Sequence, residues 1–361
     1  MLPNSPPKVM STPSSNPSKK PLLPIPQKVS PPLSSLLVVD IAQWIPKVSC
    51  SGCIKVVPER IYSMAIHPQT NPLLVAVGDK GGKIGFWSLP ASFDQSTLPV
   101  LEDGKRDISG LGTSWEFQIS NEPVTRLFFQ NDGMSLYCCS YDKSIKRLDV
   151  ETKKFETFFK LDKNFDEDIF LHHCVPFPNS EHSFLVSLSN GEILTIDERS
   201  GKIESCFQAH TKKVNTIDVH PSKSYILTAS LARSVKLWDV RKLPKTWEPH
   251  FHEREKLPTC LDCLHEYEHS LSVNSAFFNA TGEMIVTTCQ DNHLRVFPTI
   301  TEPEKEDCCA SISHRNQTGK WLTKLMALFY KPLGVKMKNN EVNYFYCGSM
   351  QEPRQVNVLL L

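Results

Sequence analysis

Residues 235–241 read Val-Lys-Leu-Trp-Asp-Val-Arg, and they are preceded by Ala-His at 209–210 and Val-His-Pro at 219–221. Apolar residues alternate with polar ones in three short runs, which begin at Val214, at Ile226 and with the quoted stretch itself. This alternation is typical of half-buried antiparallel strands, and proline fixes φ at the turn where the first strand has ended. The stretch therefore predicts a small antiparallel meander.

The same pattern recurs along the chain at irregular intervals. The residues that close equivalent runs are Trp87, Leu148, Ile196, Trp238, Phe297 and Leu359. Successive members of this set are separated by 61, 48, 42, 59 and 62 residues. The shorter intervals match the roughly 40 to 45 residues of a WD40 repeat, and the longer ones require inserted loops. Six such repeats predict an all-β fold, a WD40 β-propeller.

Composition divides the chain into three parts. Residues 1–35 are rich in Pro and Ser and carry little that could form a packed face, which predicts a disordered tail. Residues 36–57 are interpreted as a linker, and residues 58–361 as the propeller. No secretory signal begins the chain and no run of about 20 apolar residues could span a bilayer, so we expect a soluble intracellular protein without a membrane partner.

The 12 cysteines allow two interpretations. The pairs Cys50/Cys53 and Cys260/Cys263 have the spacing of zinc ligands, and together they could form a four-cysteine site. The two pairs belong to opposite ends of the repeat array, however, and five other cysteines fall in strand positions where thiols act as small hydrophobes. We expect reduced, buried thiols, no metal site and no cofactor.

Short catalytic signatures do not occur in this sequence. The chain contains no Gly-Lys-Ser/Thr phosphate loop, no Gly-x-Ser-x-Gly elbow and no His-Glu-x-x-His helix. Charge favours a binding function instead, because residues 1–57 and residues 311–361 each sum to +5 while the whole chain carries only +1. A basic segment attracts polyanions without identifying them, and solvated surface charge is the alternative meaning. We expect a non-enzymatic protein.

Four stretches resemble one group of WD40 proteins. Residues 59–68, 75–82, 314–323 and 348–354 look like signatures of the WD-repeat protein 76 group, which is related to the yeast changed-mutation-rate DNA-binding protein. The most diagnostic is Asn-Gln-Thr-Gly-Lys-Trp at 316–321, since propeller packing does not demand it. The resemblance implies a nuclear propeller that associates with DNA, acts in DNA damage responses and is linked to 5-hydroxymethylcytosine.

Five residues of that diagnostic signature are candidates for contact with DNA. Asn316 and Gln317 can form hydrogen bonds with base edges, and Arg315 and Lys320 can meet phosphates. Trp321 offers a stacking face, although a large aromatic residue that starts an apolar strand more often packs inward. The alternative function is a generic WD40 scaffold that binds other proteins through its propeller faces and does not bind DNA.

A second implied partner rests on the first stretch. Residues 226–241 resemble the motif by which propeller receptors dock onto the damaged-DNA-binding adaptor of cullin-4 ubiquitin ligases. That resemblance assigns docking to Trp238, Asp239 and above all Arg241, whose planar guanidinium suits a fixed polar contact. The alternative is an ordinary arginine at the end of a blade.

Two departures from the group affect these expectations. Ala232 stands where the docking motif carries Asp, so the blade's polar network is expected to survive only through His210, Ser230 and Trp238. The sequence also ends after residues 356–359, where the group continues into another blade. We therefore predict a seven-bladed type of propeller with the last blade missing, and with exposed strand edges in that sector.

Overall fold

The computed structural model describes residues 54–68, 73–89, 99–100, 110–162, 165–245, 262–299, 308–319, 322–330, 344–352 and 355–360. The predicted tail and almost all of the predicted linker lie outside the described residues, as do Cys50, Cys53 and Cys260. No helix among the described residues is long and apolar enough to cross a membrane.

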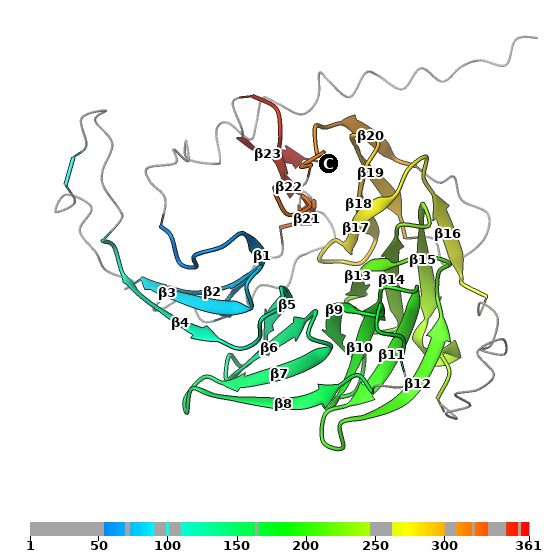
Figure 1. Ribbon diagram of the computed structural model, residues 1–361. Helices are drawn as coiled ribbons and strands as arrows, with labels where there is room; N and C mark the ends of the chain where they lie inside the picture. Colours follow the sequence, from blue (N-terminus) through cyan, green and yellow to red (C-terminus); the bar gives the residue numbers. More distant parts are fainter. Residues whose placement is uncertain are drawn as a thin grey trace, which may run out of the picture.

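The described residues form six antiparallel sheets that follow one another around a common centre (Figure 1). The strands of the first three sheets are β1 (Ile61–Ile66), β2 (Leu73–Asp79), β3 (Lys83–Leu89) and β4 (Thr113–Gln118); β5 (Val124–Phe129), β6 (Ser135–Ser140), β7 (Ser144–Asp149) and β8 (Lys154–Lys160); and β9 (Leu171–Pro176), β10 (Ser183–Leu188), β11 (Glu192–Asp197) and β12 (Lys202–Gln208).

The remaining three sheets complete the described fold. Their strands are β13 (Val214–Val219), β14 (Tyr225–Ser230), β15 (Ser234–Asp239) and β16 (His265–Glu268); β17 (Val273–Phe278), β18 (Met284–Cys289), β19 (His293–Pro298) and β20 (Ala310–Ser313); and β21 (Leu328–Phe329), β22 (Tyr344–Ser349) and β23 (Gln355–Leu360). Each sheet pairs its strands in chain order, so each is a meander, and the all-β propeller prediction is confirmed.

One detail of the predicted repeats is wrong. The six residues expected in closing strands all lie in the third strand of their sheets, and in the first five sheets a fourth strand follows. These fourth strands include β4, in which five of six residues are exposed, and β16, in which one of four residues is buried. Such outer strands expose most of their side chains, so they lack the apolar alternation by which strands are found in a sequence.

Apolar clusters fill the spaces between neighbouring sheets. Phe86 of the first sheet packs with Leu127 and Leu136 of the second, and four similar clusters join each later sheet to the next. Trp238 heads the largest fully buried side chains among the described residues. The five cysteines expected as buried thiols are buried and free; they are Cys138, Cys139, Cys206, Cys289 and Cys347.

The strand directions define two ends of the molecule. The first strand of each sheet lies innermost, and neighbouring inner strands such as β1 and β5 contact one another (Figure 1). We call the end at which the inner strands begin the mouth end. Because β13 and β15 are both antiparallel to β14, they run in the same direction, so a residue before β13 and a residue after β15 lie at opposite ends. The end beyond β15 is the far end.

The sixth sheet and the first sheet expose apolar side chains. Ile61, Met64 and Ile66 of β1 are exposed, as are Tyr346 of β22 and Val356 of β23. None of the five apolar clusters joins the sixth sheet to the first. Six blades are therefore present in the described part of the chain, and a seventh position stays a prediction.

Candidate functional site

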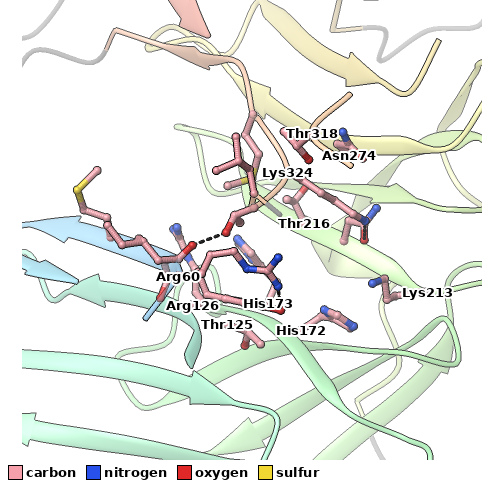
Figure 2. Close-up of a pocket in the computed structure, with 18 of the residues that line it drawn as sticks. Arg60, Thr125, Arg126, His172, His173, Lys213, Thr216, Asn274, Thr318 and Lys324 are labelled. Carbon is pink, nitrogen blue, oxygen red and sulfur yellow. Dashed lines mark hydrogen bonds between the residues drawn. The ribbon is translucent and has the colours of Figure 1, made fainter. Parts of the chain in front are cut away.

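A cavity of about 620 Å³ opens at the centre of the mouth end (Figure 2). The residues that line it come from the starts of the inner strands and from the segment before β21. Four of them are cationic side chains, each from a different element: Arg60, Arg126, Lys213 and Lys324. No Asp or Glu lines the cavity among the described residues. The cavity therefore has a positive wall.

Two lysines of this wall lie close enough to repel each other. Burial, together with the nearby charge of Lys213, lowers the pKa of Lys324 to about 8. Burial also lowers the pKa of Lys213. The Lys324 ammonium donates a hydrogen bond to the neutral Asn215 Oδ1 at 3.3 Å. Both ammonium groups are thus poorly solvated and would gain from an anion.

Arg126 is the most enclosed of the four cations. Burial lowers the pKa of its guanidinium, although the carboxylate of Asp218 acts in the opposite direction. Asp218 also accepts a hydrogen bond from the Phe278 backbone N–H at 2.8 Å. The Arg126 Nε is buried and has no hydrogen-bond partner among the described residues. The guanidinium thus lines the cavity with one N–H group that the described part of the protein leaves without an acceptor.

The two histidines of the cavity wall carry no charge at neutral pH. Burial, with a contribution from Lys213 and Lys324, lowers the pKa of His172 to about 2. Burial and the charge of Arg126 hold the pKa of His173 well below its usual value, and its Nδ1 accepts the Ile217 backbone N–H at 3.3 Å. Neither imidazole therefore contributes to the positive potential of the wall.

The side of the cavity between the first and sixth sheets is apolar. The apolar lining residues there are Ile61, Met64, Leu322, Met326 and Leu328. The Thr323 hydroxyl donates a hydrogen bond to the Ile61 carbonyl, which ties the segment before β21 to the first sheet (Figure 2). The cavity thus offers both cationic and apolar side chains to a ligand.

The segment expected to contact DNA runs to the rim of this cavity, where Thr318 and Gly319 line it. Arg315 is exposed, and Gln317 is exposed while its Nε2 donates to the Gln290 carbonyl at 3.1 Å. Lys320 and Trp321 lie outside the described residues.

Asn316 does not fit the role of a base contact. Its side chain is only 1% exposed, and its Nδ2 donates to the Cys289 carbonyl at 2.9 Å. The Asn316 backbone N–H donates to Asn292 Oδ1 at 3.2 Å. These bonds fasten the segment to the fifth sheet, and burial of the side chain keeps the amide away from a base edge.

The residues expected to dock the ligase adaptor lie at the far end. Arg241 belongs to the short 3-10 helix η3 (Val240–Lys242), which Asp239 caps by accepting the Arg241 backbone N–H at 2.9 Å. The guanidinium donates to both Asp239 oxygens, from Nε at 3.0 Å and from an Nη at 2.7 Å. The Arg241 side chain is nevertheless 77% exposed, against 5% for Asp239. A partner can therefore reach an arginine that is already oriented.

The polar network beneath Arg241 differs from the expected one. Trp238 Nε1 donates to the Thr228 hydroxyl at 2.9 Å, and that hydroxyl lies 2.8 Å from His210 Nε2. Burial lowers the pKa of His210 to about 3, so the neutral ring can accept this bond. Ser230 instead donates to the carbonyl of Lys213 at 2.9 Å. The expected role of Ser230 is wrong, and Thr228 takes it.

The cations of the cavity were not among the residues expected from the sequence. Arg126, Lys213 and Lys324 are far apart along the chain and belong to no shared motif. The one signal in the sequence is that Arg126 is the single charged residue of the strand Val124–Phe129. A charged residue in a largely buried inner strand is a signal of a polar site, because charged side chains are rarely buried without a partner.

Comparison with known proteins supports the fold. The model of the WD domain, G-beta repeat, matches residues 201–239 and 261–297. The first match covers β12 to β15, and the second covers β16 to β19. Each sequence repeat therefore combines the outer strand of one sheet with three strands of the next sheet.

Three relatives illustrate what the chain is similar to. It is 30% identical over 308 residues to WD repeat-containing protein 76 of Mus musculus, covering 84% of this chain and 43% of that protein. It is 28% identical over 309 residues to the protein of that name from Xenopus laevis, covering 84% and 46%. It is 29% identical over 292 residues to DNA damage-binding protein CMR1 of Phaeosphaeria nodorum, covering 76% and 53%.

These comparisons confirm the resemblance to the WD-repeat protein 76 group. The chain spans about half the length of the curated relatives it matches.

Proposed function

The chain is a WD40 β-propeller protein, and on that premise we propose that it binds DNA in the nucleus, as a non-enzymatic member of the DNA damage response. The observation that carries this proposal is the positive wall of the mouth-end cavity, which has no carboxylate among its described lining residues. The printed names of its CMR1 relatives, which are DNA damage-binding proteins, agree with a DNA ligand.

The mouth end supplies the other contacts of the proposed interface. Arg315 is exposed beside the cavity rim and is assigned to phosphate, as is Lys320 from the resemblance. Gln317 is exposed and keeps its side-chain oxygen for a base edge, since its Nε2 is the atom bonded to Gln290. For Trp321 the sequence allows either stacking on a base or packing in the core. Recognition of 5-hydroxymethylcytosine is the finer part of this proposal.

A DNA-binding titration with the full chain tests the proposal. Matched duplexes with unmodified cytosine, 5-hydroxymethylcytosine or a UV lesion are compared across a salt series. We expect affinity to fall steeply with salt, and Arg315→Ala to reduce the salt slope by about one, because one phosphate contact is lost. Arg241→Ala, which removes a cation at the far end, is the matched control and should leave DNA binding unchanged.

The possible results separate the alternatives. A difference between the duplexes that persists at high salt supports a reader of modified or damaged DNA. Equal, salt-sensitive binding supports DNA binding without the finer specificity. If the wild-type chain binds none of the duplexes even at low salt, the proposal fails and the generic WD40 scaffold takes its place.

Docking onto the damaged-DNA-binding adaptor of a cullin-4 ubiquitin ligase is a second candidate function. It is favoured by Arg241, which is exposed yet held in one orientation by Asp239. Capture of the purified adaptor by the wild-type chain, and its loss with Arg241→Ala, are the expected results. A wild-type chain that captures no adaptor contradicts the proposal. The two functions use opposite ends, so they are compatible.

A seven-bladed architecture with one unfilled sector is the last part of the proposal. Its support is the exposed apolar surface of β1 and β23, represented by Met64 and Val356, which a further blade would cover. Limited proteolysis is expected to cut first at the edges of that sector. Cooperative unfolding with the protease resistance of a closed ring would argue for six-bladed closure instead.

A further inference from the structure

We propose that the mouth-end cavity is a binding site for a terminal phosphate group, presented by the end of a DNA strand rather than by the continuous backbone of a duplex. This inference rests on the proposed DNA binding and names the class of DNA that the site would prefer. It is carried by the position of the cations, the charge around them and the size of the cavity.

Three cationic side chains of the cavity wall can donate hydrogen bonds to an anion. Arg126 Nε has no hydrogen-bond partner among the described residues, and the Lys324 ammonium is bonded to a neutral amide. Lys213 lines the same cavity. A lysine carries three donors, and Lys213 and Lys324 are close enough for their charges to interact, so these two side chains can share the oxygens of one phosphate while Arg126 adds positive charge to the same cavity. Burial of like charges without a lining carboxylate disfavours the empty site and favours an anion.

The mouth end also carries exposed acidic residues. Four acidic residues lie in the segments that lead into β5 and β9, and all four are exposed: Glu122, Asp166, Glu167 and Asp168. These segments precede inner strands, so they belong to the mouth end. A long polyanion laid flat across this end would meet these four carboxylates as well as exposed cations such as Arg315. A terminal phosphate that points into the cavity reaches the cations and leaves most of the strand away from these carboxylates.

The size and shape of the cavity also limit its ligand. A cavity of about 620 Å³ is in the range of sites for small molecules and cannot contain a duplex, whose major groove alone is about 12 Å wide. It is large enough for a single terminal nucleotide. Ile61 and Leu322 also line the cavity and give the base and sugar an apolar surface to pack on.

The charge of the ligand also affects binding. A terminal phosphate monoester has a second pKa of about 6, so it carries nearly two negative charges at neutral pH, whereas each internal phosphate carries one. Binding of such a dianion would raise the lowered pKa of Lys324 towards its ordinary value. The site therefore discriminates a strand end from the backbone through charge as well as through access.

The test uses the full chain and three short single-stranded DNAs of the same sequence. One carries a 5′-phosphate, one a 3′-phosphate and one no terminal phosphate, and binding is followed by fluorescence anisotropy. We expect at least one phosphorylated DNA to bind roughly tenfold more tightly than the DNA without a terminal phosphate. Inorganic phosphate should weaken that preference.

A pair of adjacent lysines supplies matched variants. Lys213→Met removes a cation of the cavity wall, and we expect it to abolish the preference for a terminal phosphate. Lys212→Met removes the same charge from an exposed neighbour that does not line the cavity, and the preference should persist. Thermal unfolding of both variants shows whether each remains folded, and Lys324→Met repeats the test from another element.

Each outcome has a defined meaning. If the wild-type chain binds the three DNAs equally, the inference is overturned while DNA binding stands; if it binds no DNA at any salt, the proposed function fails. A deoxynucleoside monophosphate that binds as tightly as the phosphorylated strand end supports the phosphate site and identifies a free nucleotide as its source. A phosphoserine peptide that binds more tightly than either overturns the assignment to nucleic acid.

Discussion

The two ends of the propeller hold their cations in opposite ways. At the mouth end, Arg126 is enclosed and its Nε has no hydrogen-bond partner among the described residues, although Asp218 acts on its charge. At the far end, Arg241 is largely exposed, yet both oxygens of Asp239 accept its hydrogen bonds. The exposure of a guanidinium thus does not show whether its hydrogen bonds are made. The exposed Arg241 has carboxylate acceptors within the protein, whereas the enclosed Arg126 has an N–H group without one in the described part of the chain.

This difference shows what each end contributes to the fold. The far end is built on satisfied bonds, with Asp239 capping η3 and Trp238 bonded to Thr228 beneath it. The mouth end gathers cations whose pKa values are lowered by burial, including Lys324, so it works against the stability of the folded chain. A cluster that costs stability is expected where a ligand is bound.

The largest expected effect comes from breaking the support of the far end. Trp238 is 1% exposed, packs edge-on against Phe207 with ring centroids 5.4 Å apart, and donates its indole N–H to Thr228. We expect Trp238→Ala to lower the free energy of unfolding by about 3–5 kcal/mol, because a large cavity forms and a buried hydroxyl loses its donor. Urea unfolding followed by circular dichroism measures the loss.

A second tryptophan provides the control for that prediction. Trp115 of β4 is 36% exposed and stacks on Phe86 with ring centroids 5.6 Å apart. Trp115→Ala should therefore cost much less than Trp238→Ala, since its ring is only partly removed from water. Equal losses of unfolding free energy for the two variants would mean that the burial and hydrogen bond of Trp238 do not stabilise the far end more than ordinary packing does.

The next effect has the opposite sign and concerns the mouth end. The pKa of Lys324 is lowered from 10.5 to about 8, so at pH 7 the folded chain holds an ammonium that would be better solvated in the unfolded chain. We expect Lys324→Met to raise the free energy of unfolding at pH 7 by roughly 1 kcal/mol, after allowance for water in the cavity. Urea titrations of both proteins measure the difference.

The pH dependence of that difference sharpens the comparison. Between pH 8 and 10.5 the unfolded wild type binds more protons at Lys324 than the folded wild type, so wild-type stability rises with pH. The advantage of Lys324→Met should shrink over this range and vanish above it. A variant that is less stable than the wild type at pH 7 would show that the mouth-end cation is satisfied within the protein.

The far end could be predicted from the sequence better than the mouth end, for a physical reason. Trp238, Asp239 and Arg241 are near neighbours on one strand and the turn that follows it, so their spacing survives in the sequence. The cavity cations come from separate sheets and meet only when the ring of inner strands has formed. No local pattern records such a meeting, and the single charge of β5 at Arg126 is the one signal that could have indicated it.

The prediction of Ser230 instead of Thr228 as the partner of Trp238 was wrong for a related reason. Ser230 and Thr228 are both on β14, and only the three-dimensional register decides which hydroxyl meets the indole of Trp238. Asn316 shows the same limit, because an amide in a signature can serve either the ligand or the fold. The sequence therefore predicted the blades well and individual hydrogen-bond partners less well, and the two proposed binding segments stay predictions.

The smallest expected effect on stability, and the most selective, comes from Arg241→Lys. The side chain is exposed, so we expect the midpoint of urea unfolding to stay unchanged. Adaptor capture should nevertheless be lost, because a lysine ammonium cannot donate to both Asp239 oxygens in one plane and still present an oriented fork to a partner. Capture is measured with the purified adaptor, as for Arg241→Ala.

Lys242→Ala is the matched control for Arg241→Lys, since Lys242 is the next residue of η3 and is also exposed. It should keep adaptor capture, which separates the geometry of Arg241 from the general charge of the helix. A lower unfolding midpoint for Arg241→Lys would make Arg241 part of the framework with Trp238. The two ends would then differ in how strongly each cation stabilises the fold. They would not differ in which cation binds a partner.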